Sequence, residues 1–448
     1  MASRSVLVVG AGIAGLTTAY RLSKLGVEVT VLEASEQVGG RMSTDRRDGY
    51  LIDRGAQFLS DGYSVICDLI SELGLGQHVA RARGWTGTVR GGAVRRTNAG
   101  YPWTVATSGL LSWRDTFRVA RASLSLVRAT RHLPLNDYSK WHTLDDADAA
   151  EWIAASFGKD ALEYVFEPML EGFYFQAPEQ MSRAWPAVVW SFGARRRRAT
   201  ALAGGIGSLP EALAQKVKVC LATPAEAIDT AGLGVSVQTP AGTLQADHLV
   251  LATTASVARQ LYAPERDVEN RLLRTDYSAA MNISFAVPEG VSTAKVPKDL
   301  YGLLIPRRER QVIAAVGVES RKCQRYVPQG ELLNVMLGGS AATRLMQASE
   351  EQVLAEVLPE LQCYFPGIDR RIGFAHFSHW PEAEPRSPVG RSRDLREYRQ
   401  LWHPGMKVIL AGDYMSIPCT EGAAESGNWA ATALVERAAR VGTSQEAA

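Results

Sequence analysis

Residues 5–15 read SVLVVGAGIAG, and this stretch decides the fold of the 448-residue chain. The β-branched run before the first glycine is typical of a strand that is buried on both faces of a parallel sheet. Residues 16–24 place apolar side chains at helical spacing, and residues 27–32 form a second β-branched run. The order strand, helix, strand predicts one βαβ unit and therefore an α/β fold.

The glycines of this stretch match the pattern GxGxxG. In that pattern they allow a tight turn, backbone approach to a diphosphate and close helix packing, while the helix N-terminus adds free N–H groups. Glu33 ends the second strand, where a carboxylate accepts hydrogen bonds from ribose hydroxyls and disfavours a 2′-phosphate. The alternative is a glycine-rich turn without a ligand. We predict an adenine-dinucleotide site formed by Gly10, Gly12, Ile13, Ala14, Gly15, Glu33 and Ala34.

The next residues narrow the dinucleotide to FAD. Residues 34–44 read ASEQVGGRMST, in which Gly40 and Arg41 approach the diphosphate from the side opposite the first loop. This element resembles the N-terminal signature of the superfamily of flavin-containing amine oxidases, protoporphyrinogen oxidases and phytoene desaturases. The resemblance is densest over residues 5–60, 202–254 and 376–434. The stretch around Trp380 lacks the cysteine that attaches flavin covalently in some relatives, so noncovalent FAD is expected.

The resemblance implies further contacts with the cofactor. Residues 53–58 are similar to the segment beside the isoalloxazine ring, and the backbone of Ala225 corresponds to the partner of the adenine edge. Residues 411–413 and 420–427 resemble the closing motif, in which an acidic residue meets the ribityl or phosphate region and a helix N-terminus faces the flavin pyrimidine. The alternative is an ordinary turn followed by a helix start. The implied cofactor contacts are Gly55, Ala56, Gln57, Phe58, Ala225, Gly412, Asp413, Thr420, Glu421, Gly422 and Ala423.

The chain is expected to interleave two domains in sequence. We predict a glutathione-reductase-like FAD-binding Rossmann domain over residues 1–70, 203–265 and 388–440. Residues 71–202 have long amphipathic stretches, including 113–131 and 149–164, and predict a helical cap. Residues 266–387 contain strand-like runs and a helix at 350–365, which predict the mixed-sheet part of a substrate domain. Residues 441–448 are expected to be a flexible tail.

The resemblance also implies the reaction. Relatives transfer hydride to flavin N5 from a carbon beside nitrogen, or from a saturated C–C or C–N unit, so the expected substrate is a mostly apolar, nitrogen-containing small molecule. Residues 157–158, 168–174 and 380–390 resemble protoporphyrinogen oxidases, whereas the closing motif is closer to amine oxidases. Met281 stands where amine oxidases commonly have a lysine. We therefore expect desaturation of the protoporphyrinogen type. The alternatives are an amine oxidase that makes an imine and hydrogen peroxide, and a non-catalytic flavin-binding interaction protein.

Candidate catalytic residues lie around the expected flavin ring. Trp380 covers the flavin or lines an apolar substrate cavity with Phe58 and Tyr174, although plain core packing is an alternative. His379 is the nearest candidate acid or base, against the alternative of a structural histidine. His376 and His379 lie three residues apart on a strand and point to opposite faces, so no metal site is expected.

Composition limits the partners. Lys and Arg total 49 against 47 Asp and Glu, which gives no reason to expect nucleic acid. Five scattered cysteines, no room for a secretory signal and no long apolar run predict a cytoplasmic protein that does not span a membrane. Residues 195–198 are four arginines, which predict a solvated hinge or a dock for an acidic group such as substrate carboxylates, a carrier protein or anionic lipid. Residues 110–131 predict a cap helix or a peripheral membrane contact. Oxygen is the expected electron acceptor, and the chain is expected to be a monomer or homodimer.

Overall fold

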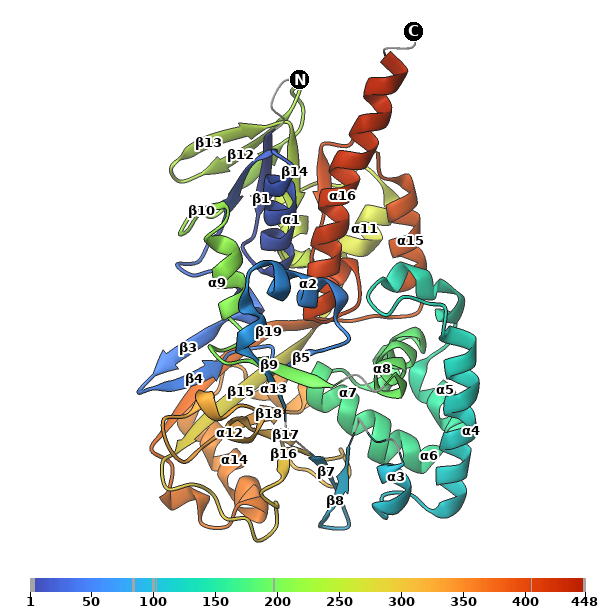
Figure 1. Cartoon of the computed structure of the whole chain (residues 1–448), viewed down its shortest axis with the longest axis vertical. Coiled ribbons are helices and arrows are strands. Elements are labelled where there is room, and N and C mark those ends of the chain that lie inside the picture. Colours follow the sequence, from blue (N-terminus) through green and yellow to red (C-terminus); the bar gives the residue numbers. More distant parts are fainter. Residues whose placement is uncertain are drawn as a thin grey trace.

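Two β-sheets of different architecture organise the chain (Figure 1). The computed structural model describes residues 5–82, 85–98, 101, 103–195, 198–403 and 405–445, the last ten of these by their backbone alone. The N-terminal strand and the C-terminal helix lie at the same end of the molecule, beside the first sheet (Figure 1). Segments near the two ends of the chain therefore contribute to the same part of the molecule.

Strands from three distant segments of the chain form the first sheet, which is parallel throughout. In spatial order, its strands are β10 (Lys218–Cys220), β2 (Glu28–Leu32), β1 (Ser5–Val9), β14 (His248–Leu251) and β20 (Val408–Leu410). Helix α1 (Ile13–Lys24) follows the glycine loop and packs against α16 (Thr420–Gln445). The predicted βαβ unit is present, and the carboxyl ends of β1 and β20 place the glycine loop beside Gly412.

Smaller elements complete this part of the molecule. They are the antiparallel strands β11 (Ala227–Asp229), β12 (Val235–Thr239) and β13 (Gly242–Ala246), the pair β3 (Thr44–Arg47) and β4 (Tyr50–Asp53), and the helices α2 (Ser64–Glu72), α9 (Ser208–Ala214), α10 (Ala255–Leu261), α11 (Asp267–Leu273) and α15 (Arg391–Leu401). Helix α16 begins at Thr420 and extends to Gln445, so part of the expected tail 441–448 is helical.

The second sheet is mixed and carries its own hydrophobic core. In spatial order, its strands are β19 (Phe374–Pro385), β15 (Tyr277–Val287), β18 (Glu331–Leu337), β17 (Ile313–Val318), β16 (Leu300–Leu304), β7 (Trp85–Arg90) and β8 (Ala93–Thr97). The helices α12 (Glu319–Lys322), α13 (Gly339–Leu345) and α14 (Glu350–Tyr364) connect or cover these strands. The predicted helix at 350–365 is therefore present.

The segment 71–202 is less helical than its sequence pattern predicts. Strands β7 and β8 belong to this segment and extend the second sheet, because β7 pairs in parallel with β16. Short strands β5 (Leu59–Ser60), β6 (Val79–Arg81) and β9 (Ala199–Leu202) form a third small sheet. Strand β7 pairs with β16, more than 200 residues later, and with β8 across the two-residue turn at Gly91 and Gly92, so the sequence also contained a local hairpin signal for it.

The rest of the segment forms the helical cap, at the lower right of Figure 1. Its helices are α3 (Thr104–Thr107), α4 (Trp113–Thr130), α5 (Ala149–Ser156), α6 (Lys159–Ala161), a π-helical turn (Leu162–Phe166), α7 (Glu167–Tyr174) and α8 (Ala184–Ala194). The expected helix at 149–164 breaks after α5, where Gly158 has φ +105°.

The surface of the cap is only partly explained by packing. Helix α4 buries Val119 and Leu126 but leaves Trp113 and Phe117 exposed. Arg195 ends α8 and donates to carbonyl groups of residues 130 and 133, whereas Arg196 and Arg197 lie outside the described residues.

No helix among the described residues combines the length and the apolar character needed to cross a membrane.

Candidate functional site

A cavity of about 750 Å³ lies between the two sheets and extends from the glycine loop to β15 and β19. Most of the predicted site residues line it. From the predicted cofactor set these are Gly10, Gly12, Ile13, Ala14, Glu33, Ala34, Gly40, Arg41, Gly55, Ala56, Gln57, Phe58, Ala225, Gly412, Asp413, Thr420 and Ala423, and from the predicted catalytic set Tyr174, His379 and Trp380. We call this space the main cavity.

Backbone atoms shape the dinucleotide end of the main cavity. Gly10 has φ +105°, and a Cβ atom there would lie 2.7 Å from the carbonyl oxygen of Ala252. A Cβ atom on Gly15 would lie 2.0 Å from the carbonyl oxygen of Gly10, so Gly15 packs helix on strand and does not itself line the cavity. In contrast, a Cβ atom on Gly12 would meet nothing within 4 Å. Gly12 thus leaves space on the cavity side, as a diphosphate requires.

Glu33 faces the same loop from the end of β2. One carboxylate oxygen accepts a hydrogen bond of 2.7 Å from the Ala11 N–H, and the other accepts one of 2.9 Å from the Ser35 N–H. These bonds hold the carboxylate at the cavity wall, and acceptor capacity remains for ribose hydroxyls. The glycine loop, the open space beside Gly12 and this carboxylate together fit an adenine dinucleotide.

An ion pair joins the two predicted FAD loops across the cavity. Two nitrogens of the Arg41 guanidinium donate to the Asp413 carboxylate at 2.6 and 3.1 Å, although the residues are 372 positions apart. Arg41 also donates to the carbonyl of Ala383 at 2.8 Å. Burial opposes the charge on Arg41, but Asp413 outweighs it and the pKa of Arg41 is raised. A permanently charged, bidentate donor is therefore fixed beside the Gly40 turn.

Aromatic side chains dominate the far end of the main cavity. Phe58 and Phe173 pack edge to face with ring centroids 5.2 Å apart. The indole N–H of Trp380 donates to the carbonyl of Arg54 at 2.9 Å, and Asn282 donates to the same carbonyl at 3.1 Å. These bonds fix the wall formed by β15 and β19.

The histidines occupy different environments. His379 is exposed at the cavity wall and its ring stacks on Phe377, with centroids 6.1 Å apart. His376 lies 3.0 Å from Asp45 and does not line the cavity. Over the part of the chain that the structure describes, no group of histidine, cysteine and acidic residues is arranged to hold a metal ion.

Met281 does not reach the main cavity. Its side chain is fully buried among Ile283 and Phe285 in the core of the second sheet, whereas Ala280 and Asn282 line the cavity. Successive side chains of a strand point to opposite faces, so a register error of one residue reverses the assignment. An irregularity of β15 between Ser278 and Ala280 shifts that register.

Glu421 also points away from the cavity. Its carboxylate accepts hydrogen bonds from the Ser64 hydroxyl at 3.0 Å and from the N–H groups of Val65 and Ile66 at 2.9 and 3.0 Å. These are the free groups at the start of α2, so the side chain ties α16 to α2. Burial raises the pKa of Glu421 to about 7. Gly422 likewise is absent from the lining, because its Cα packs against the carbonyl of Ile417.

Several lining residues were missed by the sequence reasoning. The most polar are Glu382 and Glu384 on β19, and one Glu384 carboxylate oxygen is buried without a hydrogen-bond partner. Burial and then Asp413 raise the pKa of Glu384 well above its ordinary value. Glu382 and Glu384 follow Trp380 by two and four residues on the same strand, so all three share one face. That spacing is the sequence signal that could have identified them. Other missed lining residues include Tyr63, Thr253, Thr254, Met336 and Cys419.

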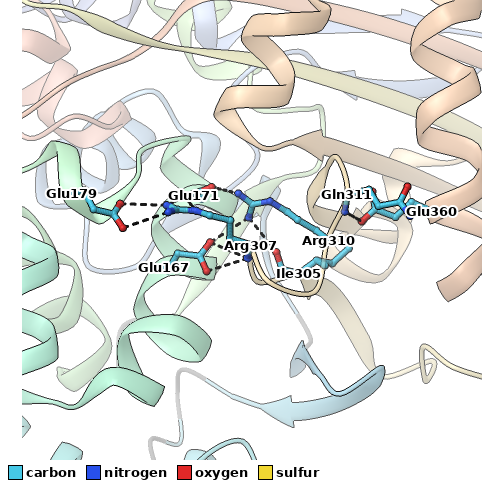
Figure 2. Close-up of polar contacts among 8 residues, drawn as sticks. All are labelled: Glu167, Glu171, Glu179, Ile305, Arg307, Arg310, Gln311 and Glu360. Carbon is cyan, nitrogen blue, oxygen red and sulfur yellow. Dashed lines mark hydrogen bonds and ion pairs between the residues drawn. The ribbon is translucent and has the colours of Figure 1, made fainter.

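An ionic cluster, shown in Figure 2, holds α7 in position. Phe173 and Tyr174 of this helix line the main cavity. Arg307 and Arg310, from the loop between β16 and β17, both bind Glu171 of α7. Arg310 also donates to Glu167 at 3.2 Å, and burial together with Glu171 raises the pKa of Glu167 to about 7. The aromatic wall is therefore held in position by charged side chains that do not line the main cavity.

The opposite side of that loop is also anchored. Glu360 of α14 accepts hydrogen bonds from the N–H groups of Gln311, Val312 and Ile313 at 2.9, 2.7 and 2.9 Å (Figure 2). The loop 305–311 is thus clamped between α7 and α14. This arrangement transmits the position of the second sheet to the aromatic wall.

The chain is similar to known proteins along almost its whole length. The family described as flavin containing amine oxidoreductase matches residues 13–435. Coproporphyrinogen III oxidase of Bacillus subtilis is 23% identical over 470 residues, which cover 94% of each chain. Coproporphyrinogen III oxidase of Mycobacterium bovis is 25% identical over 458 residues, covering 95% of this chain and 96% of the relative. The structure of cyclohexylamine oxidase from Brevibacterium oxydans matches with a TM-score of 0.75 and 20% identity, covering 98% and 100% of the two chains, and so has the same fold.

Proposed function

The chain belongs to the family of flavin-containing amine oxidoreductases, and we propose that it removes hydride from a C–N or C–C unit of a mostly apolar, nitrogen-containing small molecule. Family membership confirms the resemblance read from the sequence, the predicted fold class, FAD as the cofactor and the assignment as an oxidoreductase. The continuous cavity from the dinucleotide loops to an aromatic wall is the observation that most supports this chemistry.

The lining suggests an orientation for FAD. Glu33 and Ala225 would hold the adenosine, and the glycine loop with Arg41 the diphosphate. The remaining length of the molecule then extends toward Gln57 and Trp380. When bound, FAD supplies the hydride acceptor. The chain itself orients the substrate carbon and excludes water through its aromatic wall.

Noncovalent binding of FAD is part of the proposal. Cys419 lines the main cavity, but burial raises the pKa of its thiol to about 12. A thiol that stays protonated is a poor nucleophile for attachment of a flavin. Mass spectrometry of the denatured protein is expected to give the mass of the unmodified chain.

Dehydrogenation of the porphyrinogen type is the first candidate reaction. Two relatives that match the chain over nearly its full length are coproporphyrinogen III oxidases. The residues around Trp380 also resemble that subfamily, and the indole is fixed at the cavity wall. The expected product is a desaturated ring system.

Amine oxidation is the second candidate, and the charge of the wall favours it. Glu382 and Glu384 line the cavity, whereas Arg41 is the one Lys or Arg among the described lining residues and is already paired with Asp413. A wall with two acids favours a neutral or cationic substrate over a polyanion. Because burial and Asp413 raise the pKa of Glu384 well above its ordinary value, its carboxyl would stay protonated and donate a hydrogen bond to the nitrogen of a bound amine.

Anaerobic rapid mixing tests the proposal. The flavin absorbance of the holoenzyme is followed after addition of reduced porphyrinogens or of primary and secondary amines. Bleaching by porphyrinogens supports the first candidate, bleaching by amines supports the second, and no bleaching by either class contradicts the proposal.

Neighbouring residues of β15 provide a matched pair of variants. Asn282 lines the cavity and Met281 is buried on the opposite face. We expect Asn282→Leu to slow bleaching and Met281→Leu to leave it unchanged. Equal effects of the two variants would contradict the assignment of the faces.

A further inference from the structure

An ion pair outside the described chemistry lies behind the wall segment 53–58. Lys322 and Glu319 contact each other, with side chains only 2% and 6% exposed. The ammonium group of Lys322 also donates to the carbonyl of Gln57 and lies 3.7 Å from the carboxylate of Asp53. A buried cation therefore contacts the backbone of a segment that lines the main cavity.

Asp53 does not depend on this cation. One of its oxygens accepts hydrogen bonds from the Thr44 hydroxyl at 2.7 Å and the Ile206 N–H at 2.9 Å, and the other accepts from the Tyr326 hydroxyl at 2.8 Å. Glu319, in contrast, has Lys322 as its one ion partner within the described residues. The charges of Lys322 and Glu319 can therefore be changed individually while Asp53 keeps its three donors.

Gln57 lies between this pair and the main cavity, because it lines both that cavity and a smaller one beside Glu319 and Lys322. Its side-chain amide donates to the carbonyls of Asp53 and Gly55 at 3.0 and 2.9 Å, and its side-chain oxygen is buried without a partner. A second cavity of about 20 Å³ is lined by Gln57, Phe58, Glu319 and Lys322. That volume holds about one water molecule, which would bridge the unpartnered oxygen of Gln57 to the ion pair.

The proposed orientation of FAD brings its ring system to this wall. With the adenosine at Glu33 and the diphosphate at Arg41, the isoalloxazine must extend toward Ala56 and Gln57. Reduction increases the negative charge of the ring system. Charges act over longer distances in a buried, poorly polarisable environment than in water.

We propose that Lys322 and Glu319 are positioning residues that set the reduction potential of bound FAD, with Lys322 raising it and Glu319 lowering it. The inference rests on the proposed orientation of FAD in the cavity and on no particular substrate. Lys322 comes from α12 after β17, so it is independent of the strand position held by Met281.

Potentiometric titration of the purified holoenzyme with a reference dye tests this inference without substrate. We expect Lys322→Met to lower the midpoint potential and Glu319→Gln to raise it. Each change is expected to shift the ratio of reduced to oxidised FAD at a fixed ambient potential by on the order of tenfold. Opposite signs are the decisive feature, because general loosening of the wall would shift both variants in the same direction.

Arg321→Met is the matched control. Arg321 lies on the same helix with a side chain 8% exposed, but it donates to the carbonyls of Pro297 and Leu300 and pairs with Glu331, away from the cavity. We expect this variant to lose stability and keep the midpoint potential of the wild type. If Lys322→Met does not fold, Lys322→Arg and Glu319→Gln test the inference instead. We expect Lys322→Arg to keep the wild-type midpoint potential and Glu319→Gln to raise it.

Shifts of the same sign, or unchanged potentials at full FAD occupancy, would overturn the inference. If the variants turn over substrate normally and their midpoint potentials are unchanged, only this inference is overturned and the proposed function stands. A wild-type chain that binds no FAD would overturn both.

Discussion

The two ends of the main cavity are built in different ways. At the dinucleotide end, the backbone and the glycines of residues 10–15 define one side of the surface, and one ion pair, between Arg41 and Asp413, joins the more distant loops. At the far end, side chains from α7, β15 and β19 form the wall, and ion pairs between distant segments hold it. The difference teaches that backbone geometry from one short segment shapes most of the dinucleotide end, whereas the far end consists of side chains whose positions depend on contacts between distant segments.

Removing the central cation of the far end is expected to have the largest effect on stability. Arg310, with a side chain 6% exposed, binds both Glu167 and Glu171. Arg310→Met would leave the buried carboxylate of Glu167 without its cation and Glu171 with Arg307 alone, at a cost of about 3 to 5 kcal/mol in the free energy of unfolding. Urea denaturation measures this loss, with Arg308→Met as control, because Arg308 is 58% exposed and solvent screens its pair with Glu163. Equal losses would show that burial does not distinguish the two arginines.

Two glycines of the same loop separate folding from binding at the dinucleotide end. Gly15→Val would place a side chain 2.0 Å from the carbonyl oxygen of Gly10, and a loss of about 3 kcal/mol in the stability of the apoprotein is expected. Gly12→Ala meets nothing within 4 Å, so the apoprotein keeps its stability while FAD affinity falls. Denaturation of the apoprotein and titration with FAD measure the two effects. Unchanged FAD affinity in Gly12→Ala would contradict the diphosphate assignment.

The pH dependence of stability sharpens the comparison at the far end. The pKa of Glu167 is raised from 4.5 to about 7 by burial and by Glu171, so the folded state binds its proton more tightly than the unfolded state. This contribution is fully present below pH 4.5 and is lost as the pH rises to about 7, which costs about 1 to 3 kcal/mol. Glu167→Gln is expected to remove that slope. Identical pH profiles for the wild type and the variant would refute the assignment.

The smallest effect is expected outside both ends of the cavity. Trp113 on α4 is 77% exposed, so Trp113→Ser should change the free energy of unfolding by less than about 0.5 kcal/mol and leave FAD binding unchanged. Thermal denaturation of the holoenzyme at several concentrations measures this. A larger or concentration-dependent loss would mean that α4 is covered in solution.

The sequence reasoning failed where a single register or a distant partner decides the outcome. Met281 and Asn282 are adjacent, and an irregularity of β15 determines which of them faces the cavity. Glu421 lies in a recognisable motif, yet its carboxylate serves the start of α2, more than 350 residues away. Strand β7 forms a hairpin with β8 through Gly91 and Gly92, a local signal that was missed, whereas its pairing with β16, over 200 residues later in the chain, does not follow from neighbouring residues.

The amino-acid sequence by itself determined the α/β class, the dinucleotide loop and the FAD family, because turns, helix starts and glycine requirements depend on neighbouring residues. Only the tertiary structure decided which strand faces line the substrate space, where Glu384 and Lys322 lie, and how α7 is held. Those features depend on strand register and on ion pairs between residues distant in sequence. Their energies come from burial and from partners that meet only once the chain has folded.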